Sequence, residues 1–148
     1  MSYRLPLPAR RTGRALLLGA AIAAPLSGCG GSSSSVSPQD QIRSNFDQIK
    51  SAVQNSDAGK FCSLISTSAQ QELISQVNKL KPTHDCTSAA KILFTFGGAT
   101  LKQKLGNAKL KKITVNGDTA VTTDNTGGGP SHWLKQGGTW KLATDSGS

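Results

Sequence analysis

The first side chains to consider as metal ligands or nucleophiles in this sequence are its three cysteines and two histidines. Zinc modules bring their ligands in closely spaced pairs, and this pattern is missing from the set Cys62, His84, Cys86 and His132. The chain also lacks the Gly-x-Ser-x-Gly, His-Glu-x-x-His and Gly-x-x-x-x-Gly-Lys-Ser/Thr motifs. We therefore predict no metal site, no cofactor, and no acyl-transfer, metalloprotease or nucleotide-binding site.

Acid–base catalysis would need two carboxyl or imidazole groups in one cavity. The candidates have separate settings: a helix cap at Asp57, a turn at Asp118, a loop at His84-Asp85, and a strand face shared with Lys141 at His132. No two of them can be placed together from the sequence. We therefore predict that the protein is not an enzyme and has no catalytic residues.

The N-terminus has the layout of a secretory signal. Residues 1–28 contain four arginines and no acid, and the apolar run 15–24 is too short for a transmembrane helix, which needs about 20 residues. Leu26-Ser27-Gly28-Cys29 resembles the bacterial lipobox. In that family the signal is cut before the cysteine, whose thiol is acylated. The resemblance implies removal of residues 1–28 and lipidation at Cys29. The export route, Sec or twin-arginine, stays open despite Arg10-Arg11.

Lipidation of Cys29 would leave two cysteines in an oxidising compartment. We therefore expect Cys62 and Cys86 to form a disulfide. The mature chain has thirteen basic and eight acidic residues, so the formal charge falls from +9 to +5. Residues 29–37 are expected to be a Gly/Ser tether, and residues 38–146 a single domain. The predicted location is the extracytoplasmic face of the membrane, through the lipid anchor.

Lysines dominate the middle of the chain. Eight lysines lie between residues 79 and 112, with Asp85 as the single acid. Five of them form the predicted basic surface: Lys102, Lys104, Lys109, Lys111 and Lys112. Such a run is typical of a solvated face, and the alternative is a patch for anionic lipid or wall polymers. Nucleic acid is not predicted as a partner, because it is scarce outside the membrane.

The first half of the mature chain carries helix signals. Ser37 is the predicted N-cap of a helix with one apolar face: Ile42, Phe46, Ile49 and Val53. The predicted caps of the next three helices are, in order, Asp57, Thr67 or Ser68, and Asp85 or Thr87. Pro82 is expected to end the third helix, and Gly97-Gly98 the fourth.

The second half carries strand signals at 110–115, 119–123, 131–135 and 140–143. A turn at Gly137-Gly138 would put both tryptophans, Trp133 and Trp140, on one face, which we assign to the core. The register of the first hairpin stays open. A two-residue turn at Asn116-Gly117 sets Ile113 opposite Ala120, whereas a bulge would pair Ile113 with Val121.

This order of elements, with 148 residues and 36% hydrophobic residues, predicts one α+β domain: three to four N-terminal helices packed on a curved antiparallel sheet of about four strands. It resembles the nuclear transport factor 2-like α+β cone, most closely its small bacterial lipoproteins. The segments that carry the likeness are 42–53, 57–62, Cys86, 115–121 and 133–142. The resemblance implies a sheet wrapped around a long helix, with a conical pocket.

Members of that superfamily include isomerases and dehydratases, and many only bind ligands or partners. We predict a non-catalytic binding or interaction module of the cell envelope, with a small apolar ligand as one candidate. The candidate pocket residues are Phe46, Phe94, Trp133 and Trp140. The alternatives are a small-molecule isomerase or dehydratase of the same fold, and a structural envelope protein that acts through its basic surface.

Overall fold

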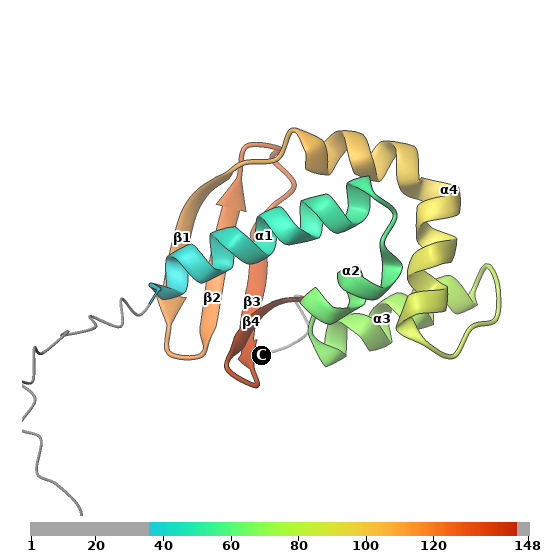
Figure 1. Cartoon of the computed structure of the whole chain (residues 1–148), viewed down its shortest axis with the longest axis horizontal. Coiled ribbons are helices and arrows are strands. Elements are labelled where there is room, and N and C mark those ends of the chain that lie inside the picture. The colour runs from blue at the N-terminus through green and yellow to red at the C-terminus, as the bar shows by residue number, and fades with distance from the viewer. Residues whose placement is uncertain (1–35, 145–148) are drawn as a thin grey trace, which may run out of the picture. The chain divides into compact units, whose positions relative to one another are not determined.

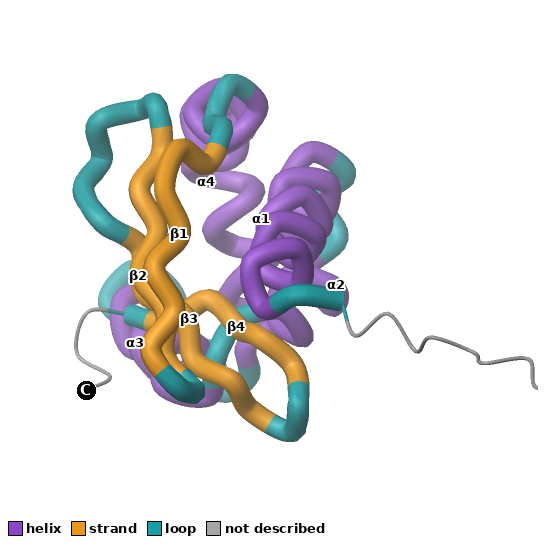
Figure 2. Tube along the Cα trace, turned by 90° about the vertical axis from the view of Figure 1, so that its left-hand side faces the viewer, coloured by secondary structure: helices purple, strands orange, loops and turns teal. Residues whose placement is uncertain are grey.

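A computed structural model describes residues 36–144. Four helices come first: α1 (Pro38–Gln54), α2 (Ala58–Leu64), α3 (Thr67–Asn78) and α4 (Cys86–Gly106). Four strands follow: β1 (Leu110–Asn116), β2 (Thr119–Asp124), β3 (Ser131–Gln136) and β4 (Thr139–Ala143). The strands form one antiparallel sheet in the order β1-β2-β3-β4. Figures 1 and 2 show α1 lying across one face of the sheet as a second layer. The α+β prediction is confirmed.

Local capping signals set the starts of the helices. The side chains of Ser37, Asp57 and Asp85 accept hydrogen bonds from the backbone N–H groups three residues later. This confirms the predicted caps Ser37 and Asp57 and selects Asp85 over the alternative Thr87. The cap of α3 is Ser66, one residue before the predicted pair. Its hydroxyl accepts from the N–H of Ala69 at 3.2 Å. The third helix ends at Asn78, ahead of Pro82.

Helix α4 continues through Gly97-Gly98, so the prediction that this pair ends the helix is wrong. Leu101 and Leu105, beyond the glycines, pack against a core cluster with Phe94 and Ala90. This packing offsets the low helix propensity of glycine. The helix changes direction about half-way along its length (Figure 1). A glycine pair is a recognised cause of such a bend.

The two β-hairpins differ in how well the sequence predicts them. Lys135 pairs with Trp140 and Trp133 with Leu142 around Gly137-Gly138, as predicted. In the first hairpin Ile113 pairs with Thr122, so both alternatives for its register are wrong. The turn is centred one residue later than predicted, on Gly117-Asp118, with Gly117 at φ 59°. Glycine with positive φ is what a type II′ turn needs at its first central position.

The core has two clusters. The first lies between α1 and the sheet and contains both indoles, together with Ile42, Phe46 and Ile49. Trp133 and Trp140 are 0% and 1% exposed, which confirms the assignment of their face to the core. The second cluster lies among the helices. It includes the disulfide between Cys62 of α2 and Cys86 of α4, which confirms the predicted pairing.

The two edge strands of the sheet, β4 and β1, are protected in different ways. On β4 the carbonyl of Leu142 accepts from the N–H of Ser66 at 2.7 Å, and the carbonyl of Trp140 accepts from Asn45. Strand β1 forms the other edge and has a β-bulge between Leu110 and Lys112. A bulge and lysines on an edge strand hinder its pairing with another chain.

Candidate functional site

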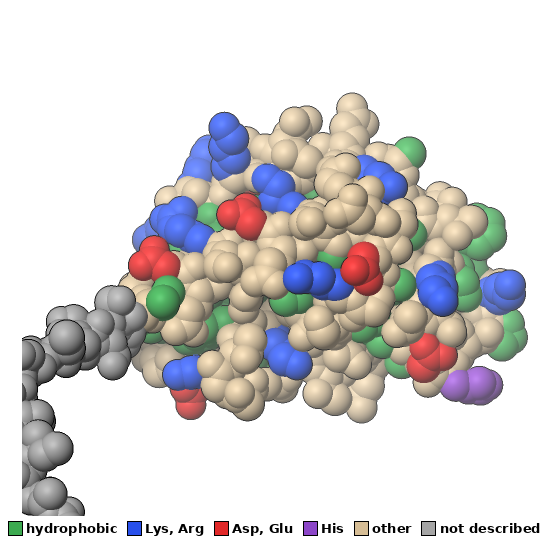
Figure 3. All heavy atoms as spheres, viewed as in Figure 1, with side chains coloured by type: hydrophobic (Ala, Val, Ile, Leu, Met, Phe, Trp, Pro, Cys, Tyr) green, Lys and Arg blue, Asp and Glu red, His purple; other side chains and the backbone are tan. Residues whose placement is uncertain are grey.

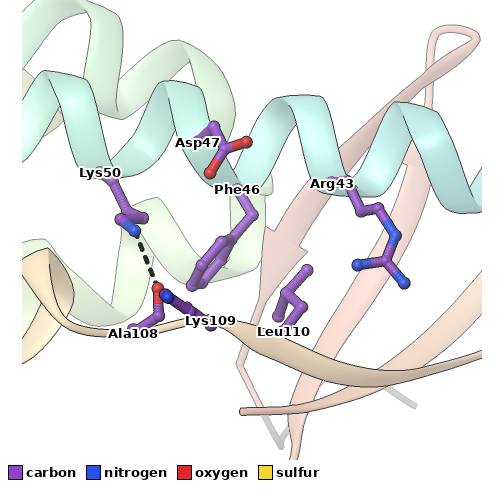
Figure 4. Close-up of a pocket in the computed structure, with 7 residues that line it drawn as sticks. All are labelled: Arg43, Phe46, Asp47, Lys50, Ala108, Lys109 and Leu110. Atoms are coloured by element: carbon purple, nitrogen blue, oxygen red, sulfur yellow. Dashed lines mark hydrogen bonds between the residues drawn. The ribbon is translucent and has the colours of Figure 1, made fainter. Parts of the chain in front are cut away.

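A groove of about 420 Å³ lies between α1 and the start of β1, and we call it the α1–β1 groove. It is lined by seven residues: Arg43, Phe46, Asp47, Lys50, Ala108, Lys109 and Leu110. Figure 4 shows Phe46 and Leu110 in its middle, with Arg43 toward one end and Lys50 toward the other. The groove therefore combines an apolar floor with cations at both ends.

Helix periodicity places the α1 residues of the groove. Phe46 follows Ile42 by four positions and shares its core-facing side, with 9% of its surface exposed. Arg43 and Lys50 are seven positions apart and lie on one side of that apolar stripe. The Lys50 ammonium donates to the carbonyl oxygen of Ala108 at 2.8 Å and lies 5.8 Å from the centre of the Phe46 ring. These contacts hold its charge at the groove.

Asn125 fixes the opposite wall of the groove, and sequence analysis missed it. Its side-chain oxygen accepts from the N–H of Lys109 at 2.6 Å, and its side-chain nitrogen donates to the carbonyl of Asn107 at 3.0 Å. Its own N–H donates to the carbonyl of Lys109 at 3.2 Å. The only local signal is an Asx residue directly after β2, a residue type that commonly bonds neighbouring backbone.

The positive charge of the groove is largely uncompensated. Three of the lining residues are cations and one, Asp47, is an acid. Throughout residues 36–144, no Lys or Arg forms an ion pair with a carboxylate. The guanidinium of Arg43 and the ammonium of Lys109 can therefore meet an anionic ligand without first breaking a salt bridge.

The four predicted pocket residues lie in different settings within the described part of the chain. Phe46 lines the α1–β1 groove, whereas Trp133 and Trp140 fill the core beneath it. Phe94 packs edge-on against Phe61, with ring centres 5.6 Å apart. Phe94 also borders a separate hollow of about 360 Å³ beside Ser56, Lys91 and Thr95.

The predicted basic surface is distributed over two elements and their connection. Lys104, Lys109, Lys111 and Lys112 are exposed, and Lys102 is half-buried. The β1 bulge explains the neighbouring pair: Leu110 and Ile113 both pack against the core, and the two lysines between them both face solvent. Cys29 lies outside the described residues.

The described acids serve mainly in local structure. The pKa of Asp85 lies below its ordinary value of 3.8, because the carboxylate accepts hydrogen bonds from the backbone and the side chain of Ser88. Asp124 accepts from both the N–H and the hydroxyl of Thr126. Within residues 36–144 there is no group of three or more His, Cys, Asp or Glu side chains suited to a metal ion. The same residues include no helix long and apolar enough to cross a membrane.

Comparison with known proteins gives no match for this chain, either to protein-family models, to curated proteins or to solved structures.

Proposed function

We propose that this protein is an exported, lipid-anchored protein of the cell envelope whose single domain binds a ligand without transforming it. The signal-like residues 1–28 and the lipobox-like Leu26–Cys29 support the anchor. The resemblance to nuclear transport factor 2-like lipoproteins supports a binding role for the domain, since many members of that superfamily only bind.

The α1–β1 groove carries the proposal for the ligand. Its floor of Phe46 and Leu110 suits an alkyl or other apolar group, and the cations around it suit an anionic head. Ligand sites commonly combine an apolar surface with a few well-placed polar groups. We therefore infer an anionic amphiphile as the ligand class.

A non-catalytic role fits the chemistry of the groove. Arg43 and Lys109 carry hydrogen-bond donors that can bind and orient an anion. Asp47 is the single carboxylate there, and neither histidine lines the groove. The groove thus offers binding groups without an acid–base pair.

The anchor is tested by the mass of the protein taken from the membrane fraction. We expect a chain that begins at Cys29 and carries lipid, and Cys29→Ser should be released from the membrane or misprocessed. Wild-type protein that is soluble and cut at another residue would contradict the anchor.

The groove is tested by calorimetric titration with decyl phosphate below its micelle-forming concentration. Decyl phosphate should bind more tightly than inorganic phosphate or decanol, because it alone fills both parts of the groove. Arg43→Gln with Lys109→Gln should weaken binding by about tenfold or more, since each charge-assisted hydrogen bond contributes about 1.5–3 kcal/mol.

The matched control is Lys60→Gln with Lys135→Gln, which removes two exposed charges from α2 and β3, outside the groove. This pair should change the affinity by less than about twofold, because exposed distant charges are screened by salt. Equal losses in the two double variants would show that overall charge, and not the groove, binds the anion.

A further inference from the structure

The chain from Cys86 to Gly117 contains six lysines and no Asp or Glu. This segment comprises α4, the α4–β1 connection and β1. Figure 1 shows the second half of α4 and the connection running along one edge of the domain. Figure 3 shows several Lys and Arg side chains toward the upper left of the domain, with acidic side chains just below them. We call the following residues the α4–β1 edge: Phe96, Lys102, Lys104, Lys111 and Lys112.

Phe96 is the unusual residue of this edge. Its side chain is 76% exposed, although it lies in the middle of a helix whose other Phe is buried. It immediately precedes Gly97-Gly98, the glycine pair in the middle of α4. The exposed ring of Phe96 is in contact with water, which is unfavourable for apolar surface. Transfer of the ring into an apolar phase would therefore lower the free energy.

We propose that the α4–β1 edge docks on an anionic lipid surface, with Phe96 entering the boundary of the acyl chains and the lysines contacting headgroup phosphates. Positive charge along the edge complements the negative surface, and each Lys near such a membrane adds to the attraction. The exposed ring favours a lipid surface over a polyanionic polymer, because charge alone would suffice for a polymer. This docking is separate from ligand binding in the α1–β1 groove.

Two acids approach this edge from other elements. Asp47 of α1 lines the α1–β1 groove, whose opposite wall includes Lys109, and Asp124 of β2 pairs with Leu110. Asp124 is half-buried and already accepts two hydrogen bonds from Thr126. The edge lysines form no ion pair with either acid, so their charge remains available to headgroups.

The test uses the full chain purified from its own membrane and reconstituted in phosphatidylcholine vesicles, with or without about 30% phosphatidylglycerol as the anionic lipid. Amide hydrogen exchange is followed by mass spectrometry. Peptides covering residues 95–112 should exchange at least about fivefold more slowly on the anionic vesicles. Because the attraction is electrostatic, about 0.5 M NaCl should abolish this difference.

Two variants of the edge, each with a matched control, decide the role of the side chains. Phe96→Ser and Lys102→Gln with Lys104→Gln should both abolish the slowing. Leu80→Ser is the control for Phe96, because Leu80 is 77% exposed and lies outside the edge. Lys60→Gln with Lys135→Gln is the control for charge, and both controls should keep the slowing.

The outcomes separate this inference from the proposed function. Equal exchange on neutral and anionic vesicles, or an effect that survives in Phe96→Ser, would overturn the docking proposal. A chain without lipid would contradict the anchor only, because the same vesicles can then be added to the free protein with the same expected slowing. The groove variant Arg43→Gln with Lys109→Gln should lose decyl phosphate binding and still show slowed exchange on anionic vesicles.

Discussion

The two buried indoles differ in one hydrogen bond, and this difference gives a sharp test of the structure. The indole N–H of Trp133 donates to the hydroxyl oxygen of Thr122 at 3.0 Å. The indole N–H of Trp140 has no hydrogen-bond acceptor within the described residues, although the side chain is 1% exposed. Trp133→Phe and Trp140→Phe each remove the same ring atoms and the same N–H group. We therefore expect them to lower the free energy of unfolding by different amounts.

The magnitude follows from what each substitution leaves behind. Both variants lose similar packing, so this cost, of order 1–3 kcal/mol, largely cancels in the comparison. Trp133→Phe also removes the donor to the buried Thr122 hydroxyl, which then keeps only a long hydrogen bond of 3.5 Å to the carbonyl of Ser131, and a poorly satisfied buried group costs about 1–3 kcal/mol. Trp140→Phe removes a buried donor that has no partner. Trp133→Phe should therefore be less stable than Trp140→Phe by about 2 kcal/mol, or roughly 10 °C in Tm.

Urea unfolding followed by fluorescence measures this difference, since the chain has two tryptophans and each variant keeps one as a probe. Thr122→Val completes a double-mutant cycle with Trp133→Phe, and the coupling should be about 1 kcal/mol or more. Thr122→Val with Trp140→Phe is the control and should be additive. Equal destabilisation by the two Trp→Phe changes, or a coupling below about 0.5 kcal/mol, would refute the hydrogen-bond argument.

Three further predictions concern the backbone and the helix termini. Reduction of Cys62–Cys86 should lower the unfolding free energy by about 3.5 kcal/mol, because the bond closes a 25-residue loop, and urea curves with and without reductant measure this. Ser56→Gly should raise it by about 0.5–1 kcal/mol, because Ser56 has φ 55° after α1, and Ser56→Ala should give no gain. The lowered pKa of Asp85 stabilises the fold at pH values above 3.8, and this contribution is lost as the pH falls through the folded-state pKa. Asp85→Asn should remove that part of the acid sensitivity of Tm, whereas an unchanged acid profile would contradict it.

Local signals predicted much of the fold. The caps at Ser37, Asp57 and Asp85 depend on residues within one helical turn, and the Gly137-Gly138 turn depends on two residues whose φ values are both positive. The first hairpin failed because Asn116-Gly117 fits an Asn-Gly turn equally well, and only the pairing with β2 selects Gly117-Asp118. The sequence alone does not decide between two hairpin registers when the turn residues are suitable for both.

The groove was harder to predict because it depends on contacts between distant segments. Phe46 was predicted to be a pocket residue. The groove that it lines lies between two segments far apart in the sequence, which are joined by the hydrogen bond from Lys50 to Ala108, 58 residues further along the chain. Asn125 shapes the wall from 16 residues beyond Lys109. The continuation of α4 past Gly97-Gly98 likewise depends on the packing of Leu101 and Leu105. Local propensity contains none of this tertiary information.

The lysines of β1 illustrate why charge alone is weak support for a binding surface. Lys111 and Lys112 lie at a bulge on an exposed edge strand. Lysines on such a strand hinder its pairing with other chains, and this structural role is enough to explain both residues. Lys102 and Lys104 lie on a helix, so edge protection does not account for them. The exposed ring of Phe96 on the same helix is likewise unnecessary for protecting the sheet. The α4 residues therefore discriminate between a merely protected edge and a membrane-docking surface, and substitutions there carry the decisive information.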